Sequence, residues 1–116
     1  MNKLSTAWSV KRINKYRNQP CVIDGHRFAS KAEGKRYSEL KLLERGNYIK
    51  DLKLQPRFQL KIGDSNLLCT YVGDFSYIDD KGKYILEDVK GVRTPVFRLK
   101  KRLMSALLKI EITEIT

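Results

Sequence analysis

The sequence predicts one α/β domain with a central mixed sheet flanked by helices. Its 116 residues suffice for one sheet-and-helix core but not for two. Two segments have the apolar spacing of amphipathic helices, and the segments between and after them alternate as half-buried strands do. The predicted order is helix, three strands, helix, strand. We expect residues 1–20 to form a basic arm or short helix ahead of a domain at residues 21–116.

A hairpin and a helix are predicted at the start of this domain. Asp24-Gly25 lies between short apolar segments and predicts a tight turn, because both residue types tolerate positive φ angles. Ser30-Lys31-Ala32-Glu33 has the form of a capping box, which marks the start of a helix. We expect this helix to continue to Arg45 and to end at Gly46.

Three strands are predicted after this helix. Residues 52–62 alternate between apolar and polar side chains, and Pro56 within them indicates an edge or a bulge. Residues 67–79 and 83–90 follow as a hairpin, closed by a three-residue loop that ends at Gly82.

A second helix and a fourth strand complete the predicted fold. Thr94-Pro95 combines an N-cap residue with a proline suited to the first helical position. The apolar stripe that we expect to cover the sheet consists of Val96, Leu99, Leu103, Ala106 and Leu107, opposite Arg98, Lys101, Arg102 and Lys109. Residues 110–115 alternate strictly and predict the last strand.

The net charge of +11 is concentrated in two segments. Residues 1–20 and 93–109 together hold 11 of the 24 basic residues, while all 13 acidic residues lie outside them. Such a concentrated positive charge suits a polyanion, although each segment alone is equally consistent with an ordinary solvated face. We therefore expect nucleic-acid contacts from the second helix and the loop before it, through Arg93, Arg98, Lys101 and Arg102.

Two carboxylates are predicted to face each other across the second hairpin. The register that its three-residue loop imposes places Asp74 opposite Asp88, on the same face of the sheet. Because strand side chains alternate, Lys90 shares this face and Glu87 points to the other. Like charges so placed repel each other, and a divalent cation such as Mg²⁺, or Mn²⁺ in its place, is the simplest means of neutralising them.

These residue types suit phosphodiester hydrolysis. The carboxylates would hold Mg²⁺, which activates a water and polarises the phosphate, and Lys90 would position the water and offset developing charge. An Asp-x-Lys sequence alone is more often an ordinary charged hairpin. However, we expect Val72, Ile78 and Leu86 on the same face, which places the charges at the edge of a covered core.

The ordered set Glu33, Asp74 and Asp88-Val89-Lys90 resembles the PD-(D/E)XK nuclease superfamily, whose restriction-endonuclease-like core is αβββαβ. Gly73-Asp74 stands where that superfamily has Pro-Asp. Over residues 22–112 the chain also resembles a family of small phage-encoded proteins assigned to the superfamily. The motifs that carry this likeness are Asp24-Gly25 with Phe28, Ser30-Lys31-Ala32-Glu33, Leu54-Gln55-Pro56, Tyr71-Val72-Gly73-Asp74-Phe75 and Glu87-Asp88-Val89-Lys90-Gly91 with Thr94-Pro95.

The resemblance implies that Glu33, Asp74 and Asp88 are acidic catalytic and metal-binding residues and that Lys90 is the catalytic lysine. Glu33 has a second explanation, since a capping box and the helix dipole account for a glutamate there without catalysis. Gln55, on the polar face of the first strand, is a lower-ranked site candidate.

The expected function is a Mg²⁺-dependent endodeoxyribonuclease that cleaves branched DNA, as Holliday-junction resolvases do. Paired cleavage favours a homodimer, and no small-molecule cofactor is expected. Residues 1–10 lack the apolar stretch of a signal peptide and no apolar run is long enough to span a membrane, so we expect a cytoplasmic protein of a phage or prophage host. The alternative is a non-catalytic DNA- or RNA-binding accessory protein that retains the fold.

Overall fold

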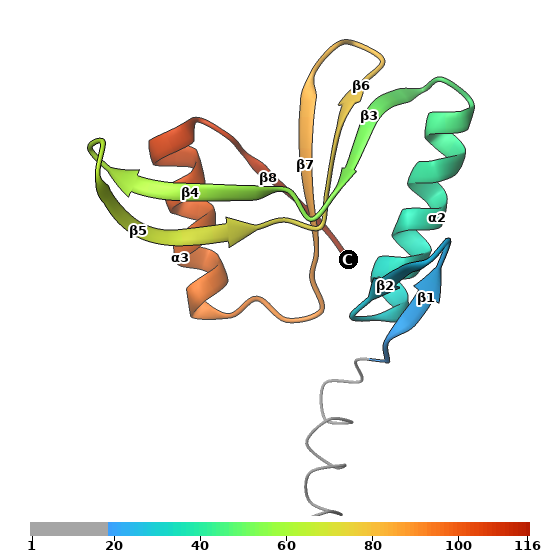
Figure 1. Ribbon diagram of the computed structural model, residues 1–116, viewed down its shortest axis with the longest axis horizontal. Coiled ribbons are helices and arrows are strands. Elements are labelled where there is room, and N and C mark those ends of the chain that lie inside the picture. The colour runs from blue at the N-terminus through green and yellow to red at the C-terminus, as the bar shows by residue number, and fades with distance from the viewer. Residues whose placement is uncertain (1–18) are drawn as a thin grey trace, which may run out of the picture. The chain divides into compact units, whose positions relative to one another are not determined.

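The chain divides into two units, residues 1–38 and 39–116, in a computed structural model that describes residues 19–116 (Figure 1). The boundary falls within helix α2 (Lys31–Arg45). The arm predicted at residues 1–20 therefore lies outside the described residues, except for its last two. No helix among the described residues is long and apolar enough to cross a membrane.

The first unit contains a small hairpin packed against the start of α2. Strands β1 (Cys21–Ile23) and β2 (His26–Phe28) pair in antiparallel register. Asp24 and Gly25 join them with φ angles of 53° and 78°, which confirms the predicted turn. The Tyr37 hydroxyl donates to Asp24 Oδ2 at 3.0 Å, and the Tyr37 ring lies 5.0 Å from that of Phe28.

Helix α2 begins with the predicted capping box. Ser30 Oγ accepts the backbone N–H of Glu33 at 3.2 Å and donates to Glu33 Oε2 at 3.3 Å. The helix ends at Arg45 as expected, but the left-handed residue beyond it is Asn47, with a φ of 65°, rather than Gly46. The Tyr48 N–H then donates to the Leu43 carbonyl at 2.9 Å, which closes the helix end.

A four-stranded mixed sheet forms the centre of the second unit, so residues 19–116 have a mixed α/β fold with two α-helices. The strands lie in the order β3, β6, β7, β8, with bounds Ile49–Leu54, Phe75–Asp79, Tyr84–Val89 and Ile112–Ile115. The first three are antiparallel neighbours, and β8 is parallel to β7.

The strands predicted at residues 52–62 and 67–79 are wrong in their continuity, because each is broken into two shorter strands. Beyond the breaks, β4 (Arg57–Ile62) and β5 (Asn66–Val72) pair only with each other and form a separate two-stranded ribbon (Figure 1). At the first break Gln55 has a φ of 50° and Pro56 lacks an N–H. The segments on both sides of the break alternate between apolar and polar residues as a strand does, so the sequence pattern does not reveal the bend.

Helix α3 (Pro95–Leu103) starts as predicted and continues as one π-helical turn, η1 (Met104–Leu108). Thr94 Oγ1 accepts the Phe97 N–H at 3.1 Å. The predicted apolar stripe is wrong in part, since Val96 and Leu99 are 61% and 57% exposed. Leu103 does pack against the core, and the buried residues are Phe97 and Met104. The helix carries apolar residues on two sides, and the side with the larger side chains faces the core.

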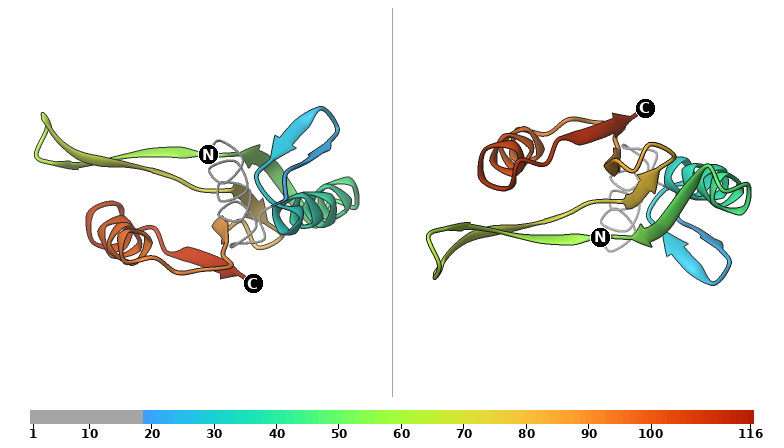
Figure 2. Two further views of the ribbon diagram at one scale, coloured as in Figure 1. Left: turned by 90° about the horizontal axis from the view of Figure 1, so that it is seen from below. Right: turned by 90° about the horizontal axis from the view of Figure 1, so that it is seen from above.

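The main core of the second unit lies between the ribbon, α3 and the strands β7 and β8, which Figure 2 shows as adjacent layers. Its buried members are Leu60, Tyr71, Leu86, Phe97, Met104 and Ile112. The bend after β5 turns Val72 outward, where it is 40% exposed, so its predicted place on the site face is wrong. Tyr71 occupies the inner side instead.

Gly73 lies where the ribbon leaves the sheet, and a side chain there has no room. An added Cβ would lie 2.7 Å from Leu86 Cδ1 and 3.4 Å from the Tyr71 ring. We expect Gly73→Ala to lower the free energy of unfolding by about 1–3 kcal/mol through overpacking, measured by urea denaturation. Gly91→Ala is the control, because no atom lies within 4 Å of its added Cβ. Equal stability of the two variants would contradict this packing.

Candidate active site

Asp74 is held against strand β7, beside Asp88. The observed pairing of Phe75 with Glu87 confirms the predicted register of the hairpin. The Asp74 N–H donates to the Glu87 carbonyl at 3.0 Å, and Asp74 Oδ2 accepts the N–H of Val89 at 2.6 Å. The Asp74 carboxylate is therefore hydrogen-bonded to the backbone N–H of the residue that follows Asp88.

Asp88 is a buried carboxylate with two partners. Its side chain is 5% exposed; Oδ1 lies 3.1 Å from Lys90 Nζ, and Oδ2 accepts the Tyr71 hydroxyl. The Lys90 ammonium also lies 4.3 Å from the centroid of the Phe97 ring, a cation–π geometry that fixes its position. A buried carboxylate is tolerated when it is paired and hydrogen-bonded, and both conditions hold here.

Tyr71 belongs to the site, although sequence reasoning missed it. Burial, together with the hydrogen bond and the charge of Asp88, raises the pKa of Tyr71 far above its usual range. The hydroxyl therefore remains a donor to Asp88 at ordinary pH. A continuous strand through residues 67–79 would have put Tyr71 on the face opposite Asp74, and only the break at Gly73 brings it to the site.

We expect Tyr71→Phe to change the alkaline stability of the protein. The folded protein keeps a proton that the unfolded chain loses near pH 10, so this contribution is complete below pH 10 and declines as the pH rises above it. Between pH 10 and 11.5, the wild type should lose stability more steeply than Tyr71→Phe, and the difference in slope should approach about 1.4 kcal/mol per pH unit at the upper end of this range.

Urea denaturation in EDTA at several pH values measures this difference. Tyr48→Phe removes a tyrosine that is 63% exposed and should keep the wild-type slope. Parallel slopes for the wild type and Tyr71→Phe would contradict the bond to Asp88.

Glu87 points away from this site, as predicted. Its side chain is buried on the opposite face of the sheet, where Glu87 Oε2 accepts the Tyr77 hydroxyl. Adjacent residues of β7 thus carry carboxylates in two separate environments, and only that of Asp88 adjoins Asp74 and Lys90.

Glu114 is a second site residue that sequence reasoning missed. Strand β8 places it beside Asp88 in the parallel register. Glu114 Oε1 lies 2.9 Å from Arg93 Nε, and Oε2 lies 2.5 Å from Lys101 Nζ. The hydrogen bond from Lys101, with the charges of Lys101 and Arg93, lowers the pKa of Glu114. The parallel register follows a whole helix, so no local signal in the sequence could have revealed this neighbour.

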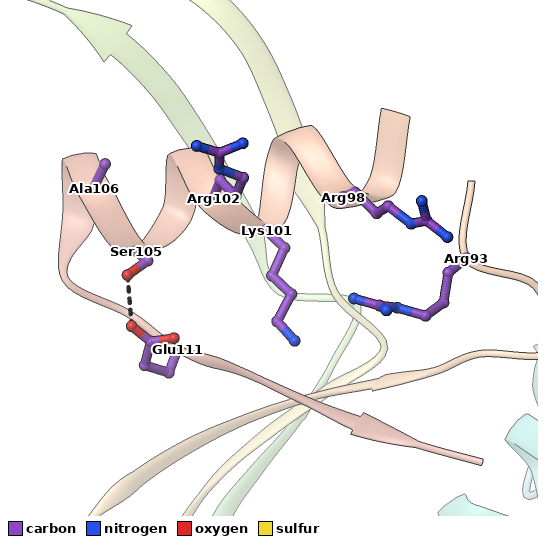
Figure 3. A pocket seen from close by; sticks show the side chains of 7 residues that line it. All are labelled: Arg93, Arg98, Lys101, Arg102, Ser105, Ala106 and Glu111. Atoms are coloured by element: carbon purple, nitrogen blue, oxygen red, sulfur yellow. Dashed lines mark hydrogen bonds between the residues drawn. The ribbon is translucent and has the colours of Figure 1, made fainter. Parts of the chain in front are cut away.

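The four basic residues predicted to bind DNA line one shallow surface groove, with a volume of about 550 Å³. We call it the basic groove, and its lining consists of Arg93, Arg98, Lys101, Arg102, Ser105, Ala106 and Glu111 (Figure 3). Glu111 is hydrogen-bonded to Ser105 at 2.5 Å. Through its bonds to Arg93 and Lys101, Glu114 connects this groove to the strand position beside Asp88.

The structure thus brings together Asp74, Asp88 and Lys90 within the second unit. Glu33 lies in the first unit, where it is hydrogen-bonded to the cap residue Ser30. Gln55 is exposed at the bend before the ribbon. Its contact with the site is through the backbone, since its N–H donates to the Asp74 carbonyl at 3.0 Å.

The acidic pair suits a hard cation that takes its other ligands from elsewhere. Within residues 19–116, no group of three or more His, Cys, Asp or Glu side chains could enclose a metal ion. Mg²⁺, however, is commonly held by one or two carboxylates together with water and substrate phosphates, rather than by an all-protein cage. Asp74, directly before β6, and Asp88, in the neighbouring strand β7, provide two such carboxylates.

These features define a small α/β protein with an acidic pair and a lysine at the edge of a mixed sheet. Residues 13–114 match the family described as "Protein of unknown function (DUF1064)". The chain therefore belongs to the DUF1064 family. No curated protein and no solved structure significantly matches it.

Proposed function

We propose that the protein is a Mg²⁺-dependent endodeoxyribonuclease of the PD-(D/E)XK type. The observation that carries this proposal is the grouping of Asp74, Asp88 and Lys90 at one end of the paired strands β6 and β7, next to a groove lined by cations. The element order α2, β3, β6, β7, α3, β8, with β8 parallel to β7, also agrees with an αβββαβ core once the ribbon is set aside as an insertion.

Asp74 and Asp88 would hold the divalent cation, Mg²⁺ or Mn²⁺, and the cation would supply Lewis-acid stabilisation of the phosphate charge. Val89 and Tyr71 keep the two carboxylates in place by donating hydrogen bonds to them. The Lys90 ammonium is held by contacts with both Asp88 and the Phe97 ring. From there it would orient a water and offset charge on the phosphate. Glu33 remains a candidate for a further acidic group.

DNA is the proposed substrate because the basic groove presents four cations. Contacts from Arg and Lys to phosphates are independent of base sequence. A structure-selective enzyme for branched DNA needs no more than such contacts and a fixed arrangement of the site. Two cuts in one junction would then require two copies of the chain, which supports a homodimer.

Removal of the groove cations should flatten the salt dependence of DNA binding. We expect the triple variant Arg98→Ala, Lys101→Ala, Arg102→Ala to reduce the slope of log affinity against log salt by about 0.9 for each phosphate that the protein no longer neutralises. Fluorescence anisotropy with a labelled four-way junction in Ca²⁺ measures the slope.

The control for this prediction removes the same amount of charge elsewhere in the second unit. Lys50, Lys81 and Lys83 are exposed, and Lys81 and Lys83 lie in the loop between β6 and β7. Their replacement by alanine should leave the slope close to that of the wild type. A groove variant that keeps the wild-type slope would show that α3 does not face the DNA.

A non-catalytic nucleic-acid-binding protein is the second candidate function. It is favoured by the ion pair between Lys90 and Asp88, because the Lys90 ammonium, 3.1 Å from Asp88 Oδ1, neutralises this carboxylate in place of a metal ion. Incubation of linear, nicked, flapped and four-way DNA with Mg²⁺, Mn²⁺ or EDTA separates the two. Metal-dependent cleavage supports the nuclease, and binding without cleavage under every condition supports the accessory protein.

A further inference from the structure

The ribbon of β4 and β5 has a solvent-facing side that the proposed active site does not use. Along β4, Arg57, Gln59 and Lys61 alternate as exposed residues. Their partners on β5 are Val72, Thr70 and Leu67, and the apolar Val72 and Leu67 are 40% and 53% exposed. Neither strand contains an acidic residue. Among residues 19–116, none of the ion pairs involves Arg57 or Lys61, so both cations remain available to a ligand. We call this side the outer ribbon face.

The opposite side of the ribbon is anchored, which fixes the direction of the outer ribbon face. Leu60 and Tyr71 belong to the buried core, and Phe58 packs against it. Lys100 of α3 also donates to the Thr70 carbonyl at 3.0 Å. The ribbon therefore extends from the sheet as a supported arm rather than as a free hairpin, with α3 along its inner side (Figure 2).

The ribbon is also joined closely to Asp74. At the crossing, the Gly73 N–H donates to the Pro56 carbonyl at 2.9 Å, and the Gln55 N–H donates to the Asp74 carbonyl at 3.0 Å. The first bond closes the base of the ribbon, and the second joins the residue before Pro56 to the backbone of Asp74, a candidate active-site residue. A ligand on the outer ribbon face would therefore be held in a fixed relation to that site.

We propose that the outer ribbon face binds in the major groove of a duplex arm of the DNA substrate. The major groove, about 12 Å wide, admits a two-stranded β-ribbon. Residues two apart on a strand are separated by about 7 Å, or about two base-pair steps of 3.4 Å, so Arg57 and Gln59 reach different base pairs. Arginine pairs with guanine O6 and N7, and glutamine with adenine N6 and N7.

This inference rests on the proposed function for its substrate class, and it adds base contacts to the phosphate contacts of the basic groove. It gives the enzyme a preferred sequence in one arm of a branched substrate. The absence of carboxylates on the face, together with its unpaired cations, favours DNA over a second copy of this basic chain as the occupant.

Guanine N7 protection from dimethyl sulfate tests the proposal, because N7 lies in the major groove. The full-length protein is bound to four-way junctions of varied arm sequence in Ca²⁺. We expect N7 protection in one arm by the wild type and its loss in the double variant Arg57→Ala, Gln59→Ala, with affinity for the preferred sequence falling about tenfold or more. Gln19→Ala, Arg45→Ala removes the same two exposed residue types elsewhere and should retain protection.

Unprotected N7 positions in the wild-type complex, or equal protection by the ribbon variant, would overturn the proposal. A ribbon variant that changes the sedimentation behaviour but not the DNA footprint would overturn it in favour of a contact between copies of the chain. N7 protection by a wild type that does not cleave supports the ribbon proposal and counts against catalysis. Cleavage without N7 protection rejects the ribbon proposal alone.

Discussion

We expect Asp88→Asn to reduce Mg²⁺-dependent DNA cleavage by about a thousandfold or more, since loss of a metal-holding charge removes several kcal/mol of transition-state stabilisation. Asparagine keeps the size of the side chain and can still accept the Tyr71 hydroxyl. DNA binding in Ca²⁺ should be equal or tighter, because one negative charge near the phosphates is lost. Asp74→Asn should behave in the same way.

The matched control is Asp80→Asn, at an exposed residue in the turn between β6 and β7. It removes the same charge away from the site and should retain full cleavage. Single-turnover rates on a four-way junction give the comparison. Parallel loss of binding and cleavage in Asp88→Asn would indicate a damaged fold rather than a lost metal site, so urea denaturation accompanies the assay.

The second large effect is expected for Lys90→Ala, which should lower the cleavage rate by about a hundredfold or more, because a preorganised charge next to the phosphate is removed. Metal binding should persist or strengthen, since the ammonium that lies 3.1 Å from Asp88 Oδ1 no longer competes with the cation. Titration calorimetry with Mn²⁺, alongside single-turnover cleavage, separates these two effects.

Lys83→Ala is the control for this variant, because Lys83 is an exposed lysine in the loop directly before β7. It should leave both the cleavage rate and the affinity for Mn²⁺ unchanged. Full cleavage by Lys90→Ala would show that Lys90 has no role in the reaction and only forms an ion pair with Asp88. Weaker Mn²⁺ binding by this variant would contradict competition between the ammonium and the cation.

Local signals in the sequence predicted a large part of the fold. The capping box at Ser30, the turn at Asp24-Gly25 and the cap at Thr94 depend on residues close together in the chain, and each is present in the structure. The register of the β6–β7 hairpin also depends on a short loop. Because that register sets which side chains face each other, the placement of Asp74 beside Asp88 and the exclusion of Glu87 were predictable.

The errors arose where distant packing decides the outcome. A left-handed Gln55 and the close approach of Gly73 to Leu86 turn the ribbon away from the sheet, yet the alternation of apolar residues continues through both breaks. The side of α3 that faces the core depends on Phe97 beneath the ribbon. Glu114 joins the site through the parallel register of β8, and no short loop fixes that register because α3 lies between β7 and β8 in the sequence.

The acidic pair Asp74 and Asp88 is proposed to form a metal-dependent phosphodiesterase site. Its most direct test is single-turnover cleavage of a four-way junction during a Mg²⁺ titration, with an EDTA arm and with Asp88→Asn prepared in parallel. We expect wild-type cleavage to rise with Mg²⁺ and to stop in EDTA, and we expect Asp88→Asn to bind the junction without cutting it. Cleavage that survives in EDTA, or in Asp88→Asn at the wild-type rate, would show that these two carboxylates do not form such a site.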